Sequence, residues 1–506
     1  MRALLRSVLL ILSLAAVAGY SISPAVAIAQ EPGSAPPPAA TPPEAAAPAS
    51  PAVEQPAPAS PAPEQPAAAG QTPPAEVTDA AKTGAKPVEP LPEDYSCLFC
   101  HADPDTFSGE EAYLLVRPQD LATDIHWTKG IRCHECHGGS PTLTDFKAHR
   151  DDPTFQSLAS PTDIPVFCGR CHSDIEYMRQ YRPSPRTDQM AEYWTSGHGQ
   201  RLKSHPDDKD VATCVSCHSH HNIRAVDDLK SPVYPTHVAQ TCSACHADPQ
   251  KMAGREYQGR PLGHSQYELW SKSIHAKVLL KDGDLSAPTC NDCHGNHGAL
   301  PPQVKSVANA CGMCHVKVAD LFAKTRMKHR FEEAGLPGCA TCHHAHDIVK
   351  PTDAMLGMTG GAVCAKCHVE QGGVSKYGAT LAGVKAARQM RQGMDQLNRQ
   401  IALTDRKLDQ AEVLGMEISK PRYELRAARD ALTNARTLIH GFAPDPVKKA
   451  LDEGLTVSGQ VEQKAQEALD TYTFRRVWLA VSLAPILIVV GLLLLYIRKM
   501  PIPPGP

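Results

Sequence analysis

The sequence predicts a mainly α-helical fold with much irregular loop, ending in a helical hairpin or stalk and one transmembrane helix. Three observations support this prediction. A pattern of two cysteines and one histidine recurs between residues 97 and 368, where Gly and Pro are frequent and long apolar periodicities are few. Apolar residues then recur at helical spacing between residues 390 and 438, and an uncharged apolar run follows near the C-terminus.

Every cysteine belongs to a Cys-x-x-Cys-His motif, and nine such motifs use all 18 cysteines. Two thiols at this spacing can each form a thioether with a haem vinyl group, and the following histidine is placed to bind the iron. The motifs therefore predict nine covalently bound haem c groups. The attachment residues are Cys97, Cys100, Cys133, Cys136, Cys168, Cys171, Cys214, Cys217, Cys242, Cys245, Cys290, Cys293, Cys311, Cys314, Cys339, Cys342, Cys364 and Cys367, and the proximal ligands are His101, His137, His172, His218, His246, His294, His315, His343 and His368.

Other uses of the Cys-x-x-Cys pair explain the pattern poorly. A structural zinc site gives no reason for a histidine directly after the second cysteine nine times over. A thioredoxin-like motif is expected once, and a disulfide framework does not require a constant spacing. Covalent haem, and with it electron transfer, is the interpretation that accounts for every cysteine.

The N-terminal residues predict export. Residues 1–29 carry Arg2 and Arg6, then the apolar run Val8 to Ala18, then small residues before a cleavage site near Ala27 or Ala29. We interpret this segment as a secretory signal peptide, with an uncleaved anchor as the alternative. The cysteine motifs are then expected in the bacterial periplasm.

The C-terminal residues predict a membrane anchor. Val477 to Ile497 is a run of 21 residues without a charge, and at about 1.5 Å per residue a helix of this length crosses a bilayer. Arg475-Arg476 and Arg498-Lys499 flank it on both sides, so the signal peptide, not the positive-inside rule, orients it. Residues 475–499 are expected to hold the protein on the inner membrane, and residues 500–506 to form a short cytoplasmic tail.

Residues 30–92 are expected to be a disordered linker. Residues 31–92 contain 18 of the 45 prolines, interleaved with Ala, Glu and Gln, and have too little apolar bulk to build a core. The formal net charge of −3 becomes −5 when Arg2 and Arg6 leave with the signal peptide. This charge shows no basic footprint for nucleic acid.

Residues 93–376 are expected to form a cytochrome c domain packed around the nine haems. The 272 residues from Cys97 to His368 supply about 30 residues for each haem, and only 5 % of the chain is aromatic. So short a chain cannot build a separate domain around each haem. The macrocycles must therefore make up much of the hydrophobic core, and neighbouring haems must lie close together.

An internal repeat predicts the distal ligands. Three times an upstream histidine is followed by Cys-x-x-Cys-His-x-x-His and then by a second Cys-x-x-Cys-His. The upstream contexts Tyr193-Trp-Thr-Ser-Gly-His198 and Trp270-Ser-Lys-Ser-Ile-His275 are related, and Phe322-Ala-Lys-Thr-Arg-Met-Lys-His329 is looser. A divergent earlier copy contains Cys133 and Cys168. The four modules supply eight distal candidates, namely His126, His149, His198, His221, His275, His297, His329 and His346.

These spare histidines predict closed coordination of the irons. Fifteen of the 24 histidines lie outside the proximal positions, and a histidine three residues after its own motif is expected to bind a different haem. The haem at Cys97 needs a further ligand, for which His205, His237, His264 and His440 are candidates, whereas His134, His220 and His344 are less suitable. Iron with two histidine ligands is low-spin, lacks the Met ligand that raises the potential, and has no open site.

The paired motifs, the Ser-x-His upstream of two pairs and the Cys-x-x-Cys-His-x-x-His units resemble the multihaem c-type cytochromes of the class III-like, doubled Cys-x-x-Cys-His or cytochrome c554-type family. The resemblance covers residues 97–368 and implies the same proximal histidines. The single membrane helix is similar to the anchor of NapC/NirT-type periplasmic quinol dehydrogenases, although those have an N-terminal anchor and fewer haems. This similarity implies the quinol pool or a membrane dehydrogenase as the electron donor.

Residues 377–474 are expected to form helices. Apolar residues at helical spacing run from Met390 to Ala411 and from Leu425 to Leu438, with breaks near Pro421 and between Gly441 and Pro446. A simple stalk, a hairpin packed beside the last haems and a homo-oligomer interface are the alternatives. We expect His440 to cap the second helix through its dipole, with haem ligation as the alternative.

Two functional hypotheses follow. In the first, the protein carries electrons in a respiratory chain from the membrane donor to a periplasmic redox protein or terminal reductase. In the second, it is an oxidoreductase acting on nitrite, hydroxylamine or a sulfur oxyanion at one open haem. Long C-terminal helices also occur in octahaem hydroxylamine oxidoreductases, and the haem at Cys97 is the candidate open site because it lies outside the modules. No catalytic residue is predicted from the sequence.

The motif count makes a direct prediction. Mass spectrometry of the purified protein should find nine haem additions, one at each pair of motif thiols, because every pair has the attachment spacing. Colourless protein, or fewer than nine additions, would contradict it.

Overall fold

The computed structural model describes residues 95–500, apart from Ala159, Gln258, Ala299 and residues 301–305 and 370–376. It does not describe the side chains of Phe146, His149 and Arg150. All described residues belong to the compact unit Thr78–Pro506. The predicted signal peptide, the whole predicted linker and residues 501–506 of the predicted tail lie outside the described residues.

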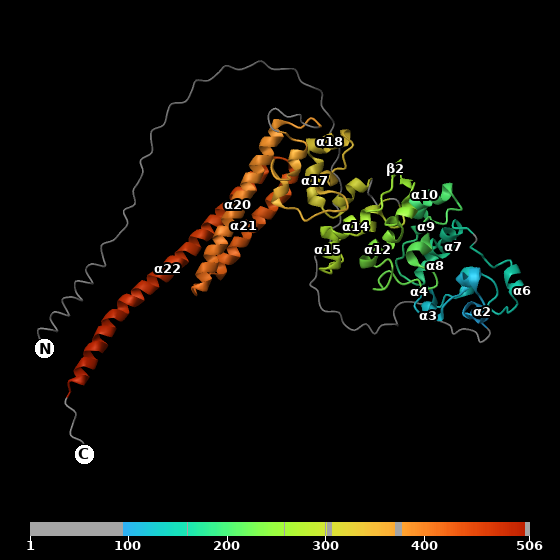
Figure 1. Ribbon diagram of the computed structural model, residues 1–506, viewed down its shortest axis with the longest axis horizontal. Coiled ribbons are helices and arrows are strands. Elements are labelled where there is room, and N and C mark those ends of the chain that lie inside the picture. The colour runs from blue at the N-terminus through green and yellow to red at the C-terminus, as the bar shows by residue number, and fades with distance from the viewer. Residues whose placement is uncertain are drawn as a thin grey trace, which may run out of the picture. The chain divides into compact units, whose positions relative to one another are not determined.

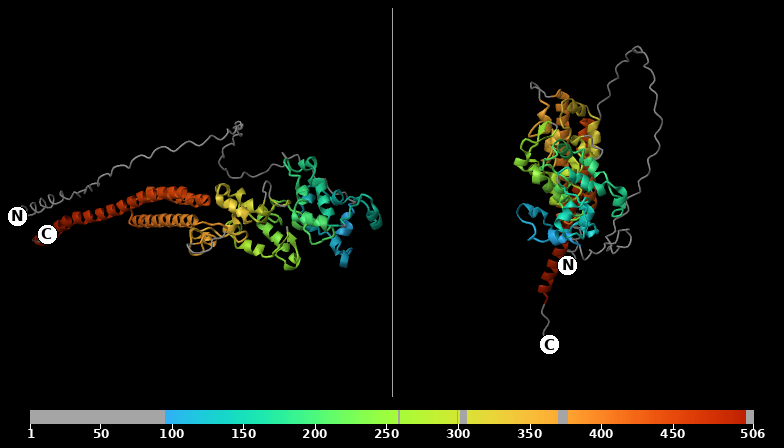
Figure 2. Two further views of the ribbon diagram at one scale, coloured as in Figure 1. Left: turned by 90° about the horizontal axis from the view of Figure 1, so that it is seen from above. Right: turned by 90° about the vertical axis from the view of Figure 1, so that its right-hand side faces the viewer.

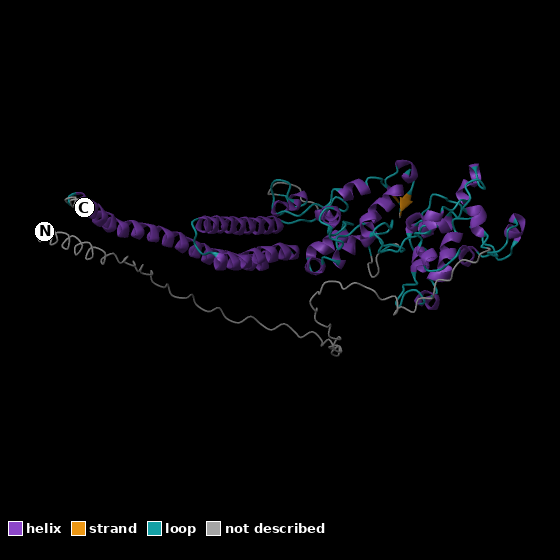
Figure 3. Ribbon diagram, turned by 90° about the horizontal axis from the view of Figure 1, so that it is seen from below, coloured by secondary structure: helices purple, strands orange, loops and turns teal. Residues whose placement is uncertain are grey.

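The prediction of a mainly α fold with much loop is confirmed (Figure 3). Short helices between irregular loops make up the motif region, which we define as residues 95–369. Its helical elements are α2 (Cys97–His101), η1 (Gly109–Leu114), α3 (Pro118–Leu121), α4 (Ile125–Thr128), α5 (Cys133–His137), α6 (Phe146–Asp151), α7 (Asp163–His172), α8 (Ile175–Arg179), α9 (Gln189–Tyr193), α10 (Gly197–Ser204), α11 (Cys214–His218), α12 (Pro235–His246), α13 (Pro249–Met252), α14 (Gln266–Ser271), α15 (Ile274–Leu280), α16 (Cys290–His294), η2 (Val307–Met313), α17 (Val316–Ala323), α18 (Arg326–Glu333), α19 (Ala340–His343), η3 (Asp353–Met355) and η4 (Val363–Lys366). Among the described residues only β1 (Glu256–Tyr257) and β2 (Arg260–Pro261) form strands, which pair antiparallel.

One helix in each module begins at a buried N-cap residue upstream of the paired motifs. The helices are α4, α10, α15 and α18, and their caps are Asp124, Ser196, Ser273 and Thr325. Each cap side chain accepts a hydrogen bond from a backbone amide of the first turn, which satisfies a donor that the helix cannot pair internally. All four modules, including the divergent first one, therefore share this capped upstream helix.

The C-terminal part is a bundle of three helices, α20 (Leu381–Val413), α21 (Ser419–Leu438) and α22 (Pro444–Arg498). The three helices lie side by side, and α22 continues beyond the other two (Figures 1 and 2). The chain leaves α20 near Gly415, which adopts a positive φ of 76° that glycine accepts without strain. A short helix, η5 (Ile439–Gly441), joins α21 to α22.

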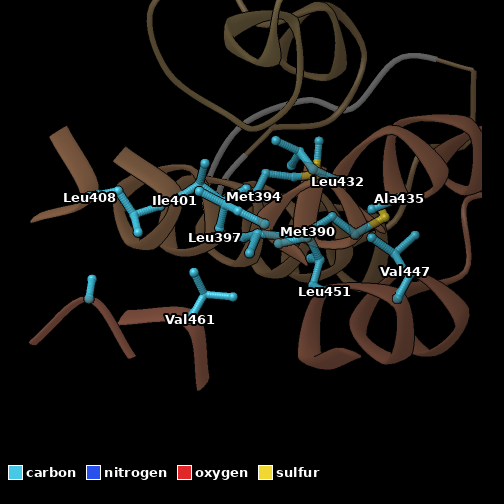
Figure 4. Packing of buried hydrophobic residues seen from close by; sticks show 14 of the residues in the cluster. Met390, Met394, Leu397, Ile401, Leu408, Leu432, Ala435, Val447, Leu451 and Val461 are labelled. Carbon is cyan, nitrogen blue, oxygen red and sulfur yellow. The ribbon is translucent and has the colours of Figure 1, made fainter. Parts of the chain in front are cut away.

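The bundle has its own hydrophobic core, which the apolar periodicity of the sequence builds. Buried side chains from all three helices interdigitate, including Met394, Leu397, Leu432 and Val461 (Figure 4). The helices therefore bury their apolar faces against one another within a single chain. This packing excludes the simple stalk.

Close contacts fix the register of the helices. A Cβ atom at Gly454 would lie 2.7 Å from Leu397 Cδ2, so only glycine allows α22 to approach α20 here. The hydroxyls of Thr404 and Ser458, both fully buried, lie 3.0 Å apart and hydrogen bond across the same two helices. Because a buried hydroxyl without a partner is costly, this pair specifies the alignment.

The bundle packs against the end of the motif region. Asp353 in η3 accepts hydrogen bonds from Arg436 of α21 and from Asn398 of α20, both at 2.8 Å. The hydrogen bond from Arg436 lowers the pKa of Asp353, so the carboxylate stays charged. On the other side of the junction, the rings of Phe442 and Phe322 of α17 meet at 6.2 Å. The alternative of helices packed beside the last motifs therefore describes the structure.

The far part of α22 is apolar and exposed. An 18-residue window of this helix has a mean hydropathy of 2.7, and none of that window is buried. By length and composition, α22 is the one helix among the described residues that could cross a membrane.

The bundle core predicts the effect of a cavity. Leu397→Ala should lower the free energy of unfolding of the bundle by about 2–5 kcal/mol, because the removed side chain is fully buried among all three helices. Val413→Ala is the matched control on the same helix, since Val413 is 87 % exposed. Chemical denaturation followed by far-ultraviolet circular dichroism measures both. Equal effects of the two substitutions would contradict the packing described here.

Candidate haem-binding sites

Most motifs form or end a short helix, which brings their three reactive side chains to one side. In α2, α5, α11 and α16 the motif is the whole helix, and in α7 and α12 it is the last turn. Residues three and four apart share a helix face, so both thiols and the histidine can approach one planar group. The local geometry therefore fits thioether attachment with one axial imidazole.

The first motif of each module ends in a sharp change of chain direction. The residue directly after its histidine has a positive φ in all four modules. These residues are Gly138 (70°), Ser219 (66°), Gly295 (82°) and His344 (66°). At Gly138 the requirement is also steric, since a Cβ atom would lie 1.9 Å from the carbonyl oxygen of Thr154. This turn directs the following residues, including the histidines at the +3 position, away from their own motif.

Seven pairs of imidazoles face one another across the motif region. A metal that binds one nitrogen of each ring at about 2 Å, as is typical of metal–imidazole bonds, separates the ring centroids by about 6 Å. The observed spacings fit this requirement. The pairs are His126–His172 (5.9 Å), His137–His221 (6.1 Å), His198–His246 (6.0 Å), His218–His297 (6.3 Å), His275–His315 (6.4 Å), His294–His346 (6.0 Å) and His343–His440 (6.2 Å).

Two pairing rules describe these contacts. The upstream histidine of a module faces the histidine of that module's second motif, as His198 faces His246. The +3 histidine faces the first-motif histidine of the preceding module, as His297 faces His218. Each +3 histidine that the structure describes therefore lies opposite the histidine of a motif other than its own. Consecutive modules are interlocked because each supplies a side chain to the one before it.

His440 completes the second rule at the last module, which no further module follows. Its ring faces His343 at 6.2 Å and 21°, in the manner of the other pairs. Its Nδ1–H donates to the carbonyl of Thr437 at 3.0 Å, which leaves Nε2 to bind a metal. Burial lowers the pKa of His440, which favours the neutral ring. The bond to Thr437 is the contact expected of a cap at the end of α21, and the ring of His343 opposite also fits the ligand alternative.

Three predicted ligands are not brought to a second imidazole. His101 and His368 face no second imidazole within the described part of the chain; their Nδ1 atoms donate to the carbonyls of Leu114 and Thr380. His329, expected as a distal ligand, is 73 % exposed and lies 3.8 Å from Glu332. His149 has no assigned partner, because its side chain lies outside the described residues.

Most paired imidazoles are held in the neutral form that binds metal. Burial lowers the pKa of His221 to about 4, and it lowers the pKa of the other buried rings in the same direction. These other rings are His172, His198, His218, His246, His275, His294, His297, His343 and His346.

Consecutive motifs adjoin one another without a break. The first thiols of neighbouring motifs lie close enough to shift one another's pKa in the pairs Cys97–Cys133, Cys168–Cys214, Cys242–Cys290 and Cys311–Cys339. At the four remaining junctions, burial and then the charge of a thiol in the next motif raise a thiol pKa, to about 11 for Cys136, Cys293 and Cys342; the pairs are Cys136–Cys171, Cys217–Cys245, Cys293–Cys311 and Cys342–Cys364. The nine motifs therefore form one series in chain order.

The same contacts assign the motif at Cys97 to a position in the repeat. It adjoins the first motif of the first module just as each second motif adjoins the first motif of the next module. The motif at Cys97 thus occupies the place of a second motif. Residues 1–96 contain no histidine that could serve as its upstream ligand.

The motif residues do not form zinc sites. Within the described residues, no group of three or more His, Cys, Asp or Glu side chains is arranged to hold a metal ion by itself. Structural zinc requires four such ligands around one point. The two imidazoles of each pair instead face each other with room for one metal held mainly by another group, as in haem.

Comparison with known proteins supports the haem assignment. Residues 283–371, which contain the last four motifs, match the family described as Cytochrome c3. The chain is 27 % identical over 292 residues to the multiheme cytochrome MtrA of Shewanella baltica (strain OS185), covering 55 % of this chain and 67 % of that protein. The chain carries a cytochrome c3-type multihaem region. No solved structure matches the chain.

The relationship to these cytochromes indicates covalently bound c-type haem and a role in electron transfer. The Cys-x-x-Cys-His motifs supply the attachment residues for such haem. The distant homology to MtrA extends beyond the four motifs of the cytochrome c3 match, since it spans 292 residues.

The position of His440 makes a testable prediction. His440→Ala should leave the haem at Cys339 with one axial ligand, so one haem of the protein should become high-spin and bind carbon monoxide when reduced. His205→Ala is the control, because His205 is exposed and its Nδ1 contacts only the neighbouring Ser204 hydroxyl. Electron paramagnetic resonance and carbon monoxide difference spectra measure the change. Spectra identical to those of the unsubstituted protein would show that His440 is not a haem ligand.

Proposed function

We propose that this protein is a membrane-anchored periplasmic nonahaem c-type cytochrome of the bacterial inner membrane. In this proposal it carries electrons from the quinol pool or a membrane dehydrogenase to a periplasmic redox protein or terminal reductase. The observation that carries the proposal is the set of seven facing imidazole pairs that links the described motifs to one another and to the bundle. Haem iron supplies reversible one-electron exchange when bound.

The side chains around each site favour electron carriage over catalysis. The two thiols of a motif hold the macrocycle, the adjacent histidine provides one axial ligand, and the facing imidazole provides the other. Seven sites have both imidazoles in place, which leaves no position for a substrate. The short protein segments between motifs keep successive sites adjacent, which suits transfer along the series.

The membrane anchor and the compartment complete the proposal. The apolar end of α22 is long enough to span a bilayer, and the same helix packs in the bundle beside the last motif. The predicted signal peptide places the motif region in the periplasm. The Asp353–Arg436 ion pair holds the bundle to η3, close in sequence to Cys364, so the last motif is the site expected to exchange electrons with a membrane donor.

One observation keeps a second function under consideration. His101 faces no second imidazole within the described residues, so the haem at Cys97 is the site where an oxidoreductase would bind nitrite, hydroxylamine or a sulfur oxyanion. The sequence offers His205, His237, His264 and His440 as its distal ligand, and any one of them would close the site. The two functions differ in whether this iron is accessible.

The full-length protein in lipid vesicles tests the proposal. If the protein carries electrons as proposed, a reduced short-chain quinol or a membrane dehydrogenase should reduce its haems. The absorbance of reduced haem should then increase. Carbon monoxide added to the reduced, undenatured protein should then leave the spectrum unchanged, because the proposed irons have two protein ligands each.

Two outcomes would overturn parts of the proposal. Haems that soluble reductants reduce but neither quinol nor membrane dehydrogenases reduce would exclude the donor. A carbon monoxide complex that disappears in Cys97→Ala/Cys100→Ala would favour the oxidoreductase, because that variant lacks the haem beside His101, which faces no second imidazole among the described residues.

A further inference from the structure

The last motif departs from the first pairing rule. The second-motif histidines His172, His246 and His315 each face an upstream imidazole about 6 Å away. His368 occupies the same place in the fourth module but faces no imidazole within the described residues. The upstream helix of this module is α18, so by the first pairing rule the side chain opposite His368 should come from α18.

The buried caps give the register of the four upstream helices. Counting from Asp124, Ser196 and Ser273, the paired histidine lies two residues after the cap in every case, at His126, His198 and His275. The cap of α18 is Thr325, whose hydroxyl accepts from the Lys328 amide at 3.1 Å, as Ser273 accepts from Ala276. Two residues after Thr325 stands Met327.

Packing around the cap gives the same register independently. In α10 and α15 a buried aromatic residue three positions before the cap packs in one cluster with a fully buried leucine six positions after it. In α18 the corresponding residues are Phe322 and Phe331, both buried, with ring centroids 5.9 Å apart. Phe331 is four residues after Met327, as Leu202 is four residues after His198, so each pair shares a helix face.

His329 lies in a different register. It is two residues beyond Met327, which at 3.6 residues per turn places it about 200° around the helix. It is 73 % exposed and lies next to Glu332 on the outer face of α18. Met327 is half-buried on the inner face. The histidine that the sequence aligned with His198 and His275 is therefore not their structural counterpart.

We propose that Met327 binds, through its thioether sulfur, the iron of the haem attached at Cys364 and Cys367, opposite His368. A thioether is uncharged and suits a partly buried site, and the flexible Met side chain can adjust to the iron. His/Met ligation raises the reduction potential of haem relative to ligation without the Met. This inference rests on the proposed function only in taking the last motif to carry a haem.

The position of this site gives the ligand a functional consequence. The motif at Cys364 is last in the series and adjoins the bundle that leads to the apolar end of α22, with Gly383 of α20 directly against the His368 ring. The first haem to accept an electron in a reductive titration should therefore be the one nearest the bundle. The haems at the sites with two facing imidazoles should accept electrons later in the titration.

Optical spectroscopy of the oxidised full-length protein tests the proposal. Ferric haem with a thioether ligand has a weak long-wavelength sulfur-to-iron charge-transfer absorption, which bis-imidazole haem lacks. The protein should show this absorption, and the absorption should be the first feature lost on stepwise reduction. Met327→His should abolish the absorption and leave the haem low-spin and reduced at lower potential. Met327→Ala should add one carbon monoxide site.

His329→Ala is the matched control, because it removes a histidine from the same helix but from the exposed face. It should leave the absorption and the carbon monoxide capacity unchanged. If His329→Ala gained a carbon monoxide site and Met327→Ala did not, His329 would be the ligand and the inference would be overturned. Absence of the absorption from protein that mass analysis shows to carry haem at Cys364 would also overturn it. Absence of haem at Cys364 would instead contradict the proposed function.

Discussion

The structure depends on one constraint, which is that each tethered macrocycle needs a second axial side chain from a different part of the chain. The Cys-x-x-Cys-His turn can supply only one imidazole, because its histidine directly follows the attachment thiol. A second imidazole for the same haem would have to come from another part of the chain. The imidazole three residues after a first motif lies opposite a motif histidine of the preceding module, as His297 lies opposite His218. The modules consequently cannot separate without losing ligands.

The same constraint explains why the helical bundle packs where it does. The last module has no successor to lend it a histidine, and α21 ends beside it with His440 in that place. The bundle thus closes the repeat as well as leading to the apolar end of α22. The ion pair between Asp353 and Arg436 and the contact of Phe442 with Phe322 hold this junction in position.

Sequence spacing predicted the attachment residues and the +3 histidines because both are local features. It could not predict which imidazoles meet, since pairing depends on tertiary contacts between modules. His440 was named as a candidate ligand, but its pairing with His343 was not predicted, because the two residues lie 97 positions apart and His440 stands in an ordinary amphipathic pattern. His329 was chosen over Met327 because the alignment followed histidine identity. Aligning Phe322 and Thr325 with Trp270 and Ser273 finds the correct register.

The most direct test of this account is a cryo-electron microscopy map of the purified, haem-loaded protein. The account predicts a porphyrin bonded to each motif, with its iron between the two imidazoles of every pair, from His126–His172 to His343–His440. A map in which these imidazoles flank no porphyrin, or in which the irons are held by other side chains, would contradict it.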